Sequence, residues 1–440
     1  KGLMASFCVF LNRNKMNVSF LIPSRNGVEY LEWAYNSIRK NQEDHEVEIL
    51  VLDDKSDKDI TWDWCVETMK DDPNFKAHQN KLPDRLGICG GHKFLAQQAT
   101  QEIICHWHND MFLGPDVLDE VEKVLYNAKF TQYGEDTGIE LGNPEFKKVV
   151  CLTRVEPPIY NPGKEKIIWK QAPTNLDGWD EDEFLNQIPT FEKEWDYKAT
   201  GGHFAPFFMF RSEYELLGGV DCKTFPKQSR EDSDLAFRLA LAGYETTQIP
   251  AFVFHFASRG NRRNKYETNE FTDNPAWTEH NVKATRNFIR KWQTFNLHDD
   301  FLKPIRPNRY NIGIVLKNPT NHLIYTLEPW CDKLDLVGEP TKVKTLKDNY
   351  IKEEQPNTTF DLTDKINSIK PSKLPDIIIE VDGNRFFQED MFYLSNISEI
   401  LTDSGEIGEM QIGNLKLNIA RLTHYEMNLV TANNEKIELE

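Results

Sequence analysis

The sequence has no surplus of basic residues, few cysteines and no long apolar run, and each absence excludes a class of protein. Lys and Arg total 52, against 70 Asp and Glu, which gives a formal net charge of −18. Nucleic acid and anionic membrane surfaces repel so acidic a chain, so we expect neither as a general partner. A phosphate-bearing ligand would need local positive charge or a metal ion.

The cysteines are scattered and include no C-x-x-C pair, so the spacing of a zinc site or a disulfide framework is missing. Several of them lie in apolar, strand-like runs. This pattern predicts reduced, buried thiols in a cytoplasmic protein. The seven residues are Cys8, Cys65, Cys89, Cys105, Cys151, Cys222 and Cys331.

The first fifteen residues contain an apolar run of about nine, too short to cross a bilayer and without a small-residue cleavage site. We interpret 1–15 as an N-terminal extension, either an extra edge strand or a start-site extension ahead of Met16, with a signal-peptide remnant as the alternative. No other run is long enough to span a membrane. The sequence therefore predicts a cytoplasmic protein, at most peripheral to a membrane.

The chain is long enough for a sizeable α/β domain over 16–300 and a smaller α/β domain over 310–440, joined by a proline-containing linker at 301–309. In the first domain apolar runs predict strands at 18–23, 47–52, 102–107, 149–155 and 166–170, with helices at 30–39 and 281–292. The rest of 131–189 is broken by Gly and Pro into turns. In the second domain we expect strands at 311–316, 334–337, 376–381 and 415–419 and helices at 321–326 and 386–400.

Three of the predicted strands end in polar residues, which is typical of the carboxyl edge of an open α/β sheet, where ligands usually bind. The first strand leads into Ser24 to Gly27, the second into Asp53 and Asp54, and the third into 108–110, His-Asn-Asp. These groups are candidates for a single site.

The segment 230–244, REDSDLAFRLALAGY, places Glu231 and Asp232 ahead of a short amphipathic helix that stops at Gly243. A carboxylate fixed at such a helix start can be directed into a cleft. The alternative is that Asp232 or Ser233 serves only as the N-cap.

Together these segments resemble the inverting family 2 glycosyltransferases, which have the GT-A fold. The resemblance covers about residues 16–260 and rests on five motifs in the family's order. They are P-S-R-N at 23–26, V-L-D-D-K-S at 51–56, H-N-D at 108–110, F-R-S-E-Y-E-L-L-G-G-V-D at 210–221 and R-E-D-S-D-L-A-F-R-L from 230, followed by a strand ending in His255. Residues 310–440 resemble nothing known to us and could recruit an acceptor, a partner or another copy of the chain.

The resemblance implies transfer of a sugar from a nucleotide-diphosphate sugar, most commonly a uridine diphosphate sugar, to a hydroxyl of a glycan, a lipid-linked glycan or a protein glycan. A divalent cation, Mn²⁺ or Mg²⁺, would assist the leaving group. The metal ligands carried over are Asp110 and His255, although a strand-end histidine can also be purely structural. His108 replaces the first acid of the family's D-x-D and brings no negative charge, so metal affinity is expected to be weakened.

In this resemblance Asp232 is the general base and Glu231 flanks the acceptor. Asp53 and Asp54 bind the base and ribose, with a strand-ending Asx turn as the alternative role for one of them. Residues implied to bind the donor are Pro23, Ser24, Arg25, Asp53, Asp54, Arg85, Lys93, His108 and Asn109. Those implied on the acceptor side are Gly201, Gly202 and His203.

Two further sets of residues have open interpretations. Arg259, Arg262 and Arg263 belong either to a solvated loop or to a lid over the diphosphate. The tryptophans Trp169, Trp179 and Trp195 either stack on sugars or belong to the core.

Two other classes of function compete with a transferase. A binding or structural protein on the same scaffold would have lost the reaction, and the altered D-x-D favours it. A sugar-phosphate nucleotidyltransferase would need a glycine-rich loop after the first strand, and 23–27 contain only one glycine.

Overall fold

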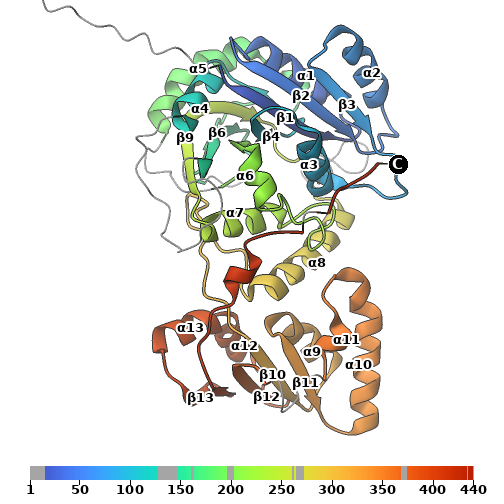
Figure 1. Cartoon of the computed structure of the whole chain (residues 1–440), viewed down its shortest axis with the longest axis vertical. Helices are drawn as coiled ribbons and strands as arrows, with labels where there is room; N and C mark the ends of the chain where they lie inside the picture. The colour runs from blue at the N-terminus through green and yellow to red at the C-terminus, as the bar shows by residue number, and fades with distance from the viewer. Residues whose placement is uncertain are drawn as a thin grey trace, which may run out of the picture.

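The computed structural model describes residues 15–126, 146–159, 163–195, 203–259, 262–263, 272–367, 374–433 and 435–439. The described chain forms two α/β domains, one above the other in Figure 1. This confirms the predicted α/β class with a second, smaller domain. The predicted N-terminal extension and the glycines Gly201 and Gly202 lie outside the described residues, apart from Lys15 of the extension.

The first domain is built on a mixed sheet of nine strands with the order β3-β2-β1-β4-β8-β6-β9-β5, and β7 pairs with β6. The strands β1 to β4 run parallel, whereas β8 is antiparallel to both of its neighbours. The strands are β1 Asn17–Ser24, β2 Glu46–Asp53, β3 Phe75–Gln79, β4 Ile103–His106, β5 Met111–Leu113, β6 Lys148–Glu156, β7 Lys166–Ile168, β8 Phe207–Phe210 and β9 Glu245–His255.

Helices cover both faces of this sheet (Figure 1), so its strands are buried on both sides and read as continuous apolar runs. Phe20 and Ile22 of β1 face the core shared with α1, α2 and α4, while Leu21 faces the core shared with α3, α7 and α8. The helices are α1 Val28–Lys40, α2 Thr61–Asp71, α3 Gly87–Gln98, α4 Val117–Leu125, α5 Glu181–Glu194, α6 Arg211–Leu216, α7 Glu231–Leu241 and α8 Pro275–Trp292.

Helix α5 corrects the prediction that 131–189 contains only turns and two strands. Asp180 caps the helix by accepting a hydrogen bond from the Glu183 amide, and Pro189 lies inside it. Its Phe184 and Phe191 join an aromatic core with Trp169 and Trp179, and Trp195 packs beside that core. The three tryptophans therefore serve the core, and none of them lines the main cavity.

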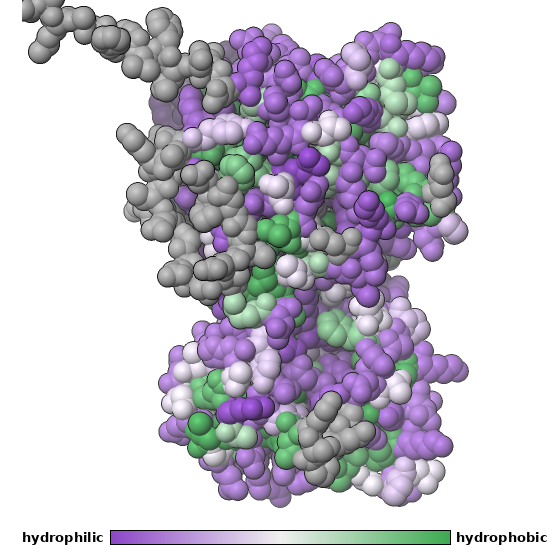
Figure 2. Space-filling model, in the orientation of Figure 1, coloured by the Kyte–Doolittle hydropathy of each residue, from purple (hydrophilic) through white to green (hydrophobic). Residues whose placement is uncertain are grey.

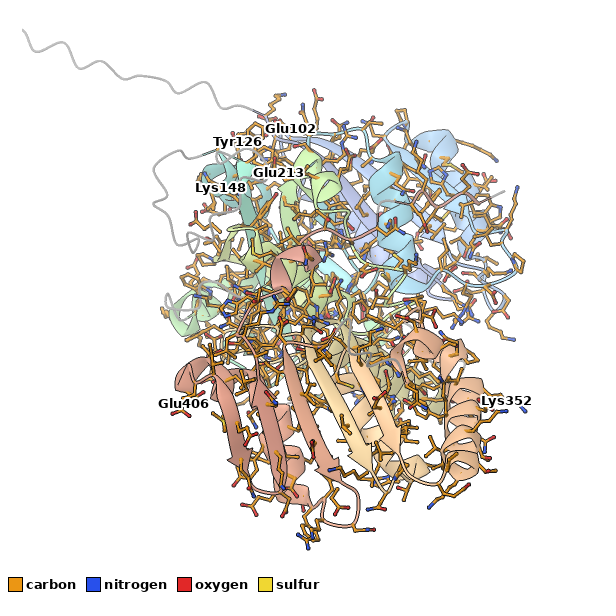
Figure 3. The ribbon with its side chains drawn as sticks, turned by 60° about the horizontal axis from the view of Figure 1, so that its bottom comes forward. Glu102, Tyr126, Lys148, Glu213, Lys352 and Glu406 are labelled. Carbon is orange, nitrogen blue, oxygen red and sulfur yellow. The ribbon has the colours of Figure 1, made fainter. Side chains whose placement is uncertain are left out.

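The second domain has a five-stranded sheet of order β11-β10-β12-β14-β13. Its strands are β10 Ile312–Lys317, β11 Lys333–Val337, β12 Ile377–Asp382, β13 Gly408–Ile412 and β14 Leu415–Ile419. The four predicted strands are confirmed, and β13 was not predicted. The helices are α9 Asn321–Leu327, α10 Pro340–Glu354, α11 Leu362–Lys365, α12 Gln388–Ser395 and α13 Ile397–Ser404, so the helix predicted at 386–400 is broken at Asn396. Figure 3 shows these strands in a row below the first domain, with Glu406 and Lys352 toward opposite sides.

The predicted boundaries of the second domain need one correction, because the last residues return to the first domain. The amide of Ala432 donates to the Leu217 carbonyl (2.8 Å), and the amide of Ile437 donates to Gln97 of α3 (3.1 Å). Val430 is buried in the core of the first domain. Figure 1 places the C-terminus beside α3. Residues 430–433 and 435–439 therefore belong structurally to the first domain.

The surface agrees with the charged composition. In Figure 2 hydrophilic residues cover most of the visible face of both domains. Among the helices that the structure describes, none combines the length and the apolar content needed to cross a bilayer.

Candidate active site at the carboxyl ends of the central strands

A cavity of about 680 Å³ lies where β1, β6 and β9 end, walled by the first turn of α3, the start of α7 and the N-terminal half of α8. The strand ends converge there because they share one edge of the sheet. Helix α3 approaches β1 closely, since a Cβ on Gly91 would lie only 2.7 Å from the Pro23 Cβ. Polar groups from segments far apart in the sequence thus face one space.

Three side chains that could hold a metal ion meet on one wall of the cavity. His108, Asp110 and His255 each offer a ligand atom, and these atoms all lie within 4.8 Å of one another. Asp110 and His255 meet because β5 pairs antiparallel with β9, with Met111 opposite His255. The Nε2 of His255 lies 3.5 Å from the Asp110 carboxylate, whose other oxygen accepts from the Arg259 amide (3.0 Å).

The chemistry of this donor set fits a divalent metal. The Nδ1 of His255 lies 2.9 Å from Glu156, and a proton held there leaves the Nε2 lone pair free to bind a cation. Burial would raise the pKa of Asp110, but His255 outweighs burial and lowers it to about 2, so this ligand is ionised. Burial lowers the pKa of His108 to about 4, so its imidazole is neutral. One carboxylate with two imidazoles suits a transition metal better than Mg²⁺.

A proton competes with a metal ion at His255. Burial alone would lower the pKa of this histidine, but the carboxylates of Asp110 and Glu156 outweigh burial and raise it to about 9. Below that pH the imidazole is a cation between two carboxylates, and a metal ion must displace its Nε2 proton.

The structure brings together a second group of possible ligands, Glu43, His45 and Asp119, on the outer side of the first domain. The Nδ1 of His45 faces the Met16 amide N–H (3.2 Å), so in the neutral ring the proton is on Nε2, which donates to Asp119 (3.1 Å). That imidazole has no lone pair left for a cation, and we assign this group a structural role.

The two predicted acids line the cavity from the first turn of α7. The helix begins at Glu231, and Arg230 occupies the cap position in the left-handed region (φ 73°) with no side-chain cap bond. Neither Asp232 nor Ser233 is the N-cap, so that alternative is wrong. Both acids lie beside the positive end of the helix dipole.

The environments of the two acids differ. The Glu231 oxygen Oε2 is buried without a hydrogen-bond partner, although the residue as a whole is partly exposed. Burial, and then the charge of Asp232, raise the pKa of Glu231 well above its ordinary value. Asp232 accepts a hydrogen bond from the Ser233 amide (2.6 Å). Two neighbouring carboxyls in unlike environments can divide into a proton donor and a base.

The predicted donor-binding residues divide between the cavity and its support. Pro23, Ser24, Arg25, Asp54, His108 and Asn109 line the cavity. Asn109 donates to the Ser24 hydroxyl (3.0 Å), which joins two of the strand ends. Asp54 also accepts from the Leu86 and Gly87 amides (2.9 and 2.8 Å) and so shapes the start of α3.

Asp53 does not line the cavity. It is fully buried and accepts a hydrogen bond from the Ser56 amide (3.0 Å), so it has the turn-forming role that was the alternative for one of the pair.

Three other predicted residues lie away from the cavity. Lys93 is buried, and its ammonium donates to the Asn433 carbonyl of the returning tail. Arg85 is not among the lining residues. His203 is buried, and both its ring nitrogens lack a hydrogen-bond partner. That absence holds among the residues that the structure describes. His203 lines a small neighbouring cavity of about 20 Å³ together with Asp232 and His298.

The arginines after β9 have different roles. Arg262 lines the cavity, stacks over Trp277 (4.3 Å to the ring centre) and forms two hydrogen bonds with Asp273 (2.8 and 2.7 Å). Arg263 also binds Asp273 (2.9 Å), whereas the Arg259 guanidinium donates to the Thr174 carbonyl. Of the three, Arg262 alone is positioned to meet a ligand in the cavity.

Several side chains that line the cavity were not predicted from the sequence. Glu156 accepts from Lys166 (2.8 Å) and lies 3.2 Å from Arg154, and Arg154 stacks over Phe204 (4.2 Å). Arg154 and Glu156 sit at the end of a predicted strand, which is the same signal that singled out the residues after the first three strands. Trp277 and Asn281 of α8 also line the cavity, and no motif marks them.

Comparisons with known proteins show one family match and several distant structural similarities. Residues 19–133 match the family model described as Glycosyl transferase family 2. Similar solved structures include the mannosyltransferase PcManGT from Pyrobaculum calidifontis in complex with GDP-Man and Mn²⁺ (17% identity, 63% of this chain, 64% of that chain, TM-score 0.38). They also include GalNAc-T7 with UDP, GalNAc and Mn²⁺ (15% identity, 64% of this chain, 49% of that chain, TM-score 0.42). A third is S. aureus TarS (15% identity, 64% of this chain, 41% of that chain, TM-score 0.37).

The similarity to these structures is distant. The chain covers less than two thirds of each of them, and with TM-scores below 0.5 they carry no argument about its activity. No curated protein matches the sequence.

Proposed function

Because residues 19–133 match the model of glycosyl transferase family 2, we propose that the chain is an inverting transferase that moves a sugar from a nucleotide-diphosphate sugar to an acceptor hydroxyl. The observation that carries this proposal is the single cavity in which a metal-competent group, His108, Asp110 and His255, faces the acids Glu231 and Asp232. A transferase of this kind needs a metal ion to stabilise the leaving group and a carboxylate to take the proton from the attacking oxygen.

The donor is proposed to lie with its nucleotide against Pro23 to Arg25 and Asp54 and its diphosphate toward Asp110 and Arg262. A divalent cation bound there would neutralise the charge that builds on the diphosphate as it leaves. Arg262, which also lines the cavity, can reinforce this, because Trp277 and Asp273 hold its guanidinium in place. A uridine diphosphate sugar is the donor that we would test first.

Asp232 is proposed as the general base. It takes the proton from the acceptor hydroxyl as that oxygen attacks the anomeric carbon on the face opposite the leaving diphosphate, which inverts the configuration. The pKa of Glu231 is raised by burial, which favours its protonated form, and in that form it can donate a hydrogen bond to the acceptor beside this hydroxyl. The acceptor side then includes Phe204 and Arg154 on the wall beyond β6.

The function is tested with a panel of nucleotide sugars in the presence of Mn²⁺ or Mg²⁺, read as release of free nucleotide diphosphate and as thermal shift in the same samples. Release with one donor supports transfer and identifies the sugar. A thermal shift without release, in the presence of a broad set of hydroxyl acceptors, would instead favour a binding protein on this scaffold. The replacement of an acid by His108 is the observation that keeps this second possibility open.

A further inference from the structure

Two thiols outside the proposed mechanism lie in direct contact. The Sγ atoms of Cys89 and Cys222 are 3.0 Å apart, which is about 1 Å from the bonded distance of about 2.05 Å. Cys89 is buried in the first turn of α3, and Cys222 is half-buried in the segment between α6 and α7. Among the cysteines that the structure describes, no other two sulfurs are in hydrogen-bonding contact.

The two cysteines belong to segments that form adjoining walls of the cavity. Helix α3 begins with Gly87 and Ile88, which line the cavity, and the segment after Cys222 leads to Gln228, Ser229 and Arg230, which line it as well. The Cys89 amide already donates to the Lys227 carbonyl (2.9 Å). A Cβ on Gly87 would lie 2.4 Å from that same oxygen, so the two backbones touch.

The two walls, α3 and the 222–230 segment, meet through non-covalent contacts. Lys227, Ser229 and Arg230 all have φ near +72°, a conformation that costs free energy for residues other than glycine. The backbone hydrogen bond from Cys89 to Lys227 and the close packing at Gly87 join this strained segment to α3. A covalent bond between Cys89 and Cys222 would fix the same contact.

We propose that Cys89 and Cys222 are a redox-active pair that forms a disulfide when the chain meets a small disulfide such as oxidised glutathione, and that this bond staples the 222–230 segment to α3. The thiolate of Cys222 attacks oxidised glutathione, forming a mixed disulfide and releasing one reduced glutathione. The thiolate of Cys89 then attacks the Cys222 sulfur and releases the second. Two protein thiols lose two electrons and two protons, and one glutathione disulfide gains them.

The order of these steps follows from exposure. Burial raises the pKa of the Cys89 thiol well above its ordinary value, which makes it a poor first nucleophile, whereas Cys222 reaches solvent. Once the mixed disulfide has formed at Cys222, its sulfur is already in contact with Cys89. Neither thiol lines the cavity, so this chemistry is independent of the proposed transfer reaction.

The test treats the full chain with oxidised glutathione, alkylates the remaining thiols after denaturation and maps the peptides by mass spectrometry. We expect a peptide containing Cys89 linked to one containing Cys222, reversed by dithiothreitol and absent from Cys222→Ser. The matched control Cys331→Ala, which removes a buried thiol of the second domain, should keep the link. A glutathione that stays on Cys222, or both thiols remaining alkylatable, would overturn the proposal.

The restraint that the disulfide places on the 222–230 segment is tested by amide hydrogen exchange. Oxidation should slow exchange of the 222–230 segment at least about tenfold in the native chain and leave it unchanged in Cys222→Ser. Equal exchange before and after a confirmed disulfide would show that the bond does not restrain the segment.

Discussion

Glu328 at the junction of the two domains gives the sharpest prediction for stability. Its carboxylate is fully buried and receives hydrogen bonds from Arg290 of α8 (3.1 and 2.7 Å), from the Tyr350 hydroxyl (2.8 Å) and an ion pair from Lys365 (2.7 Å). Arg286 and Arg290 also bind Glu354 (2.9 and 2.5 Å). Helix α8 of the first domain is thereby tied to the second domain by a buried network of charges.

We predict that Glu328→Gln destabilises the chain by about 3–5 kcal/mol, because the change leaves the cations of Arg290 and Lys365 buried with one carboxylate fewer. For domains of this size such a loss lowers Tm by roughly 6–20 °C. Thermal unfolding followed by circular dichroism or calorimetry measures it. The donor-binding residues lie in the other domain, so donor affinity of the folded variant should be unchanged.

Glu380→Gln is the matched control. Glu380 pairs with Lys317 at 2.7 Å in the second domain, but both side chains are about half exposed, so its loss should cost at most about 1 kcal/mol. If the two variants differed by less than about 1 kcal/mol, the buried network would not be what holds the domains together.

The same network predicts a pH dependence. Burial alone would raise the pKa of Glu328, but Lys365 and Arg290 outweigh burial and hold that pKa well below its ordinary value. Its contribution is therefore fully present above the pKa of an unfolded glutamate, about 4.3, and is lost as pH falls below it toward the folded pKa. Glu328→Gln should accordingly flatten the decrease of Tm between about pH 4.5 and 2.5. An unchanged acid slope would refute the assignment.

Three further predictions concern the cavity. Asp232→Asn should lower the transfer rate by roughly 10²–10⁴-fold and leave the donor Kd within about threefold, and near-normal transfer by the folded variant would remove Asp232 as the base. Asp110→Ala should weaken metal-dependent donor binding at least about tenfold by calorimetry, unlike Asp119→Ala on the outer side of the domain, and equal binding by both variants would exclude Asp110 as the ligand. Glu156→Gln should weaken Mn²⁺ binding by about 10–100-fold, because Glu156 orients His255. The native chain should bind Mn²⁺ more tightly than Mg²⁺, and a preference for Mg²⁺ would contradict the assigned set of metal ligands.

The strands and the edge that carries the site could be predicted because their physical causes are local. Strands buried on both faces have continuous apolar sequences, and the polar residues that follow parallel strands must lie along one edge of the sheet. Asp110 was found this way, whereas His255 was carried over from the resemblance to the family. The same rule applied to β6 would have found Glu156, which orients His255.

What could not be predicted depends on contacts between distant segments. The prolines and glycines of 131–189 indicate turns, but packing of Phe184 and Phe191 into an aromatic core overrides that signal and forms α5 around Pro189. Lys93 has the residue type and position of a phosphate ligand, yet its ammonium donates a hydrogen bond to a carbonyl 340 residues away in the sequence. Nothing near Lys93 in the sequence marks that partner.

Helix α8 shows how the second domain bears on the site. Near its N-terminal end Trp277 and Asn281 line the cavity, and near its C-terminal end Trp292 donates to Asp234 (2.9 Å), two residues after Asp232. Between them Arg286 and Arg290 are fixed to the second domain. Rotation of that domain on α8 would have to break the buried network around Glu328, which is costly. Any group that the second domain binds would therefore be held in a fixed position relative to Asp232, the proposed base.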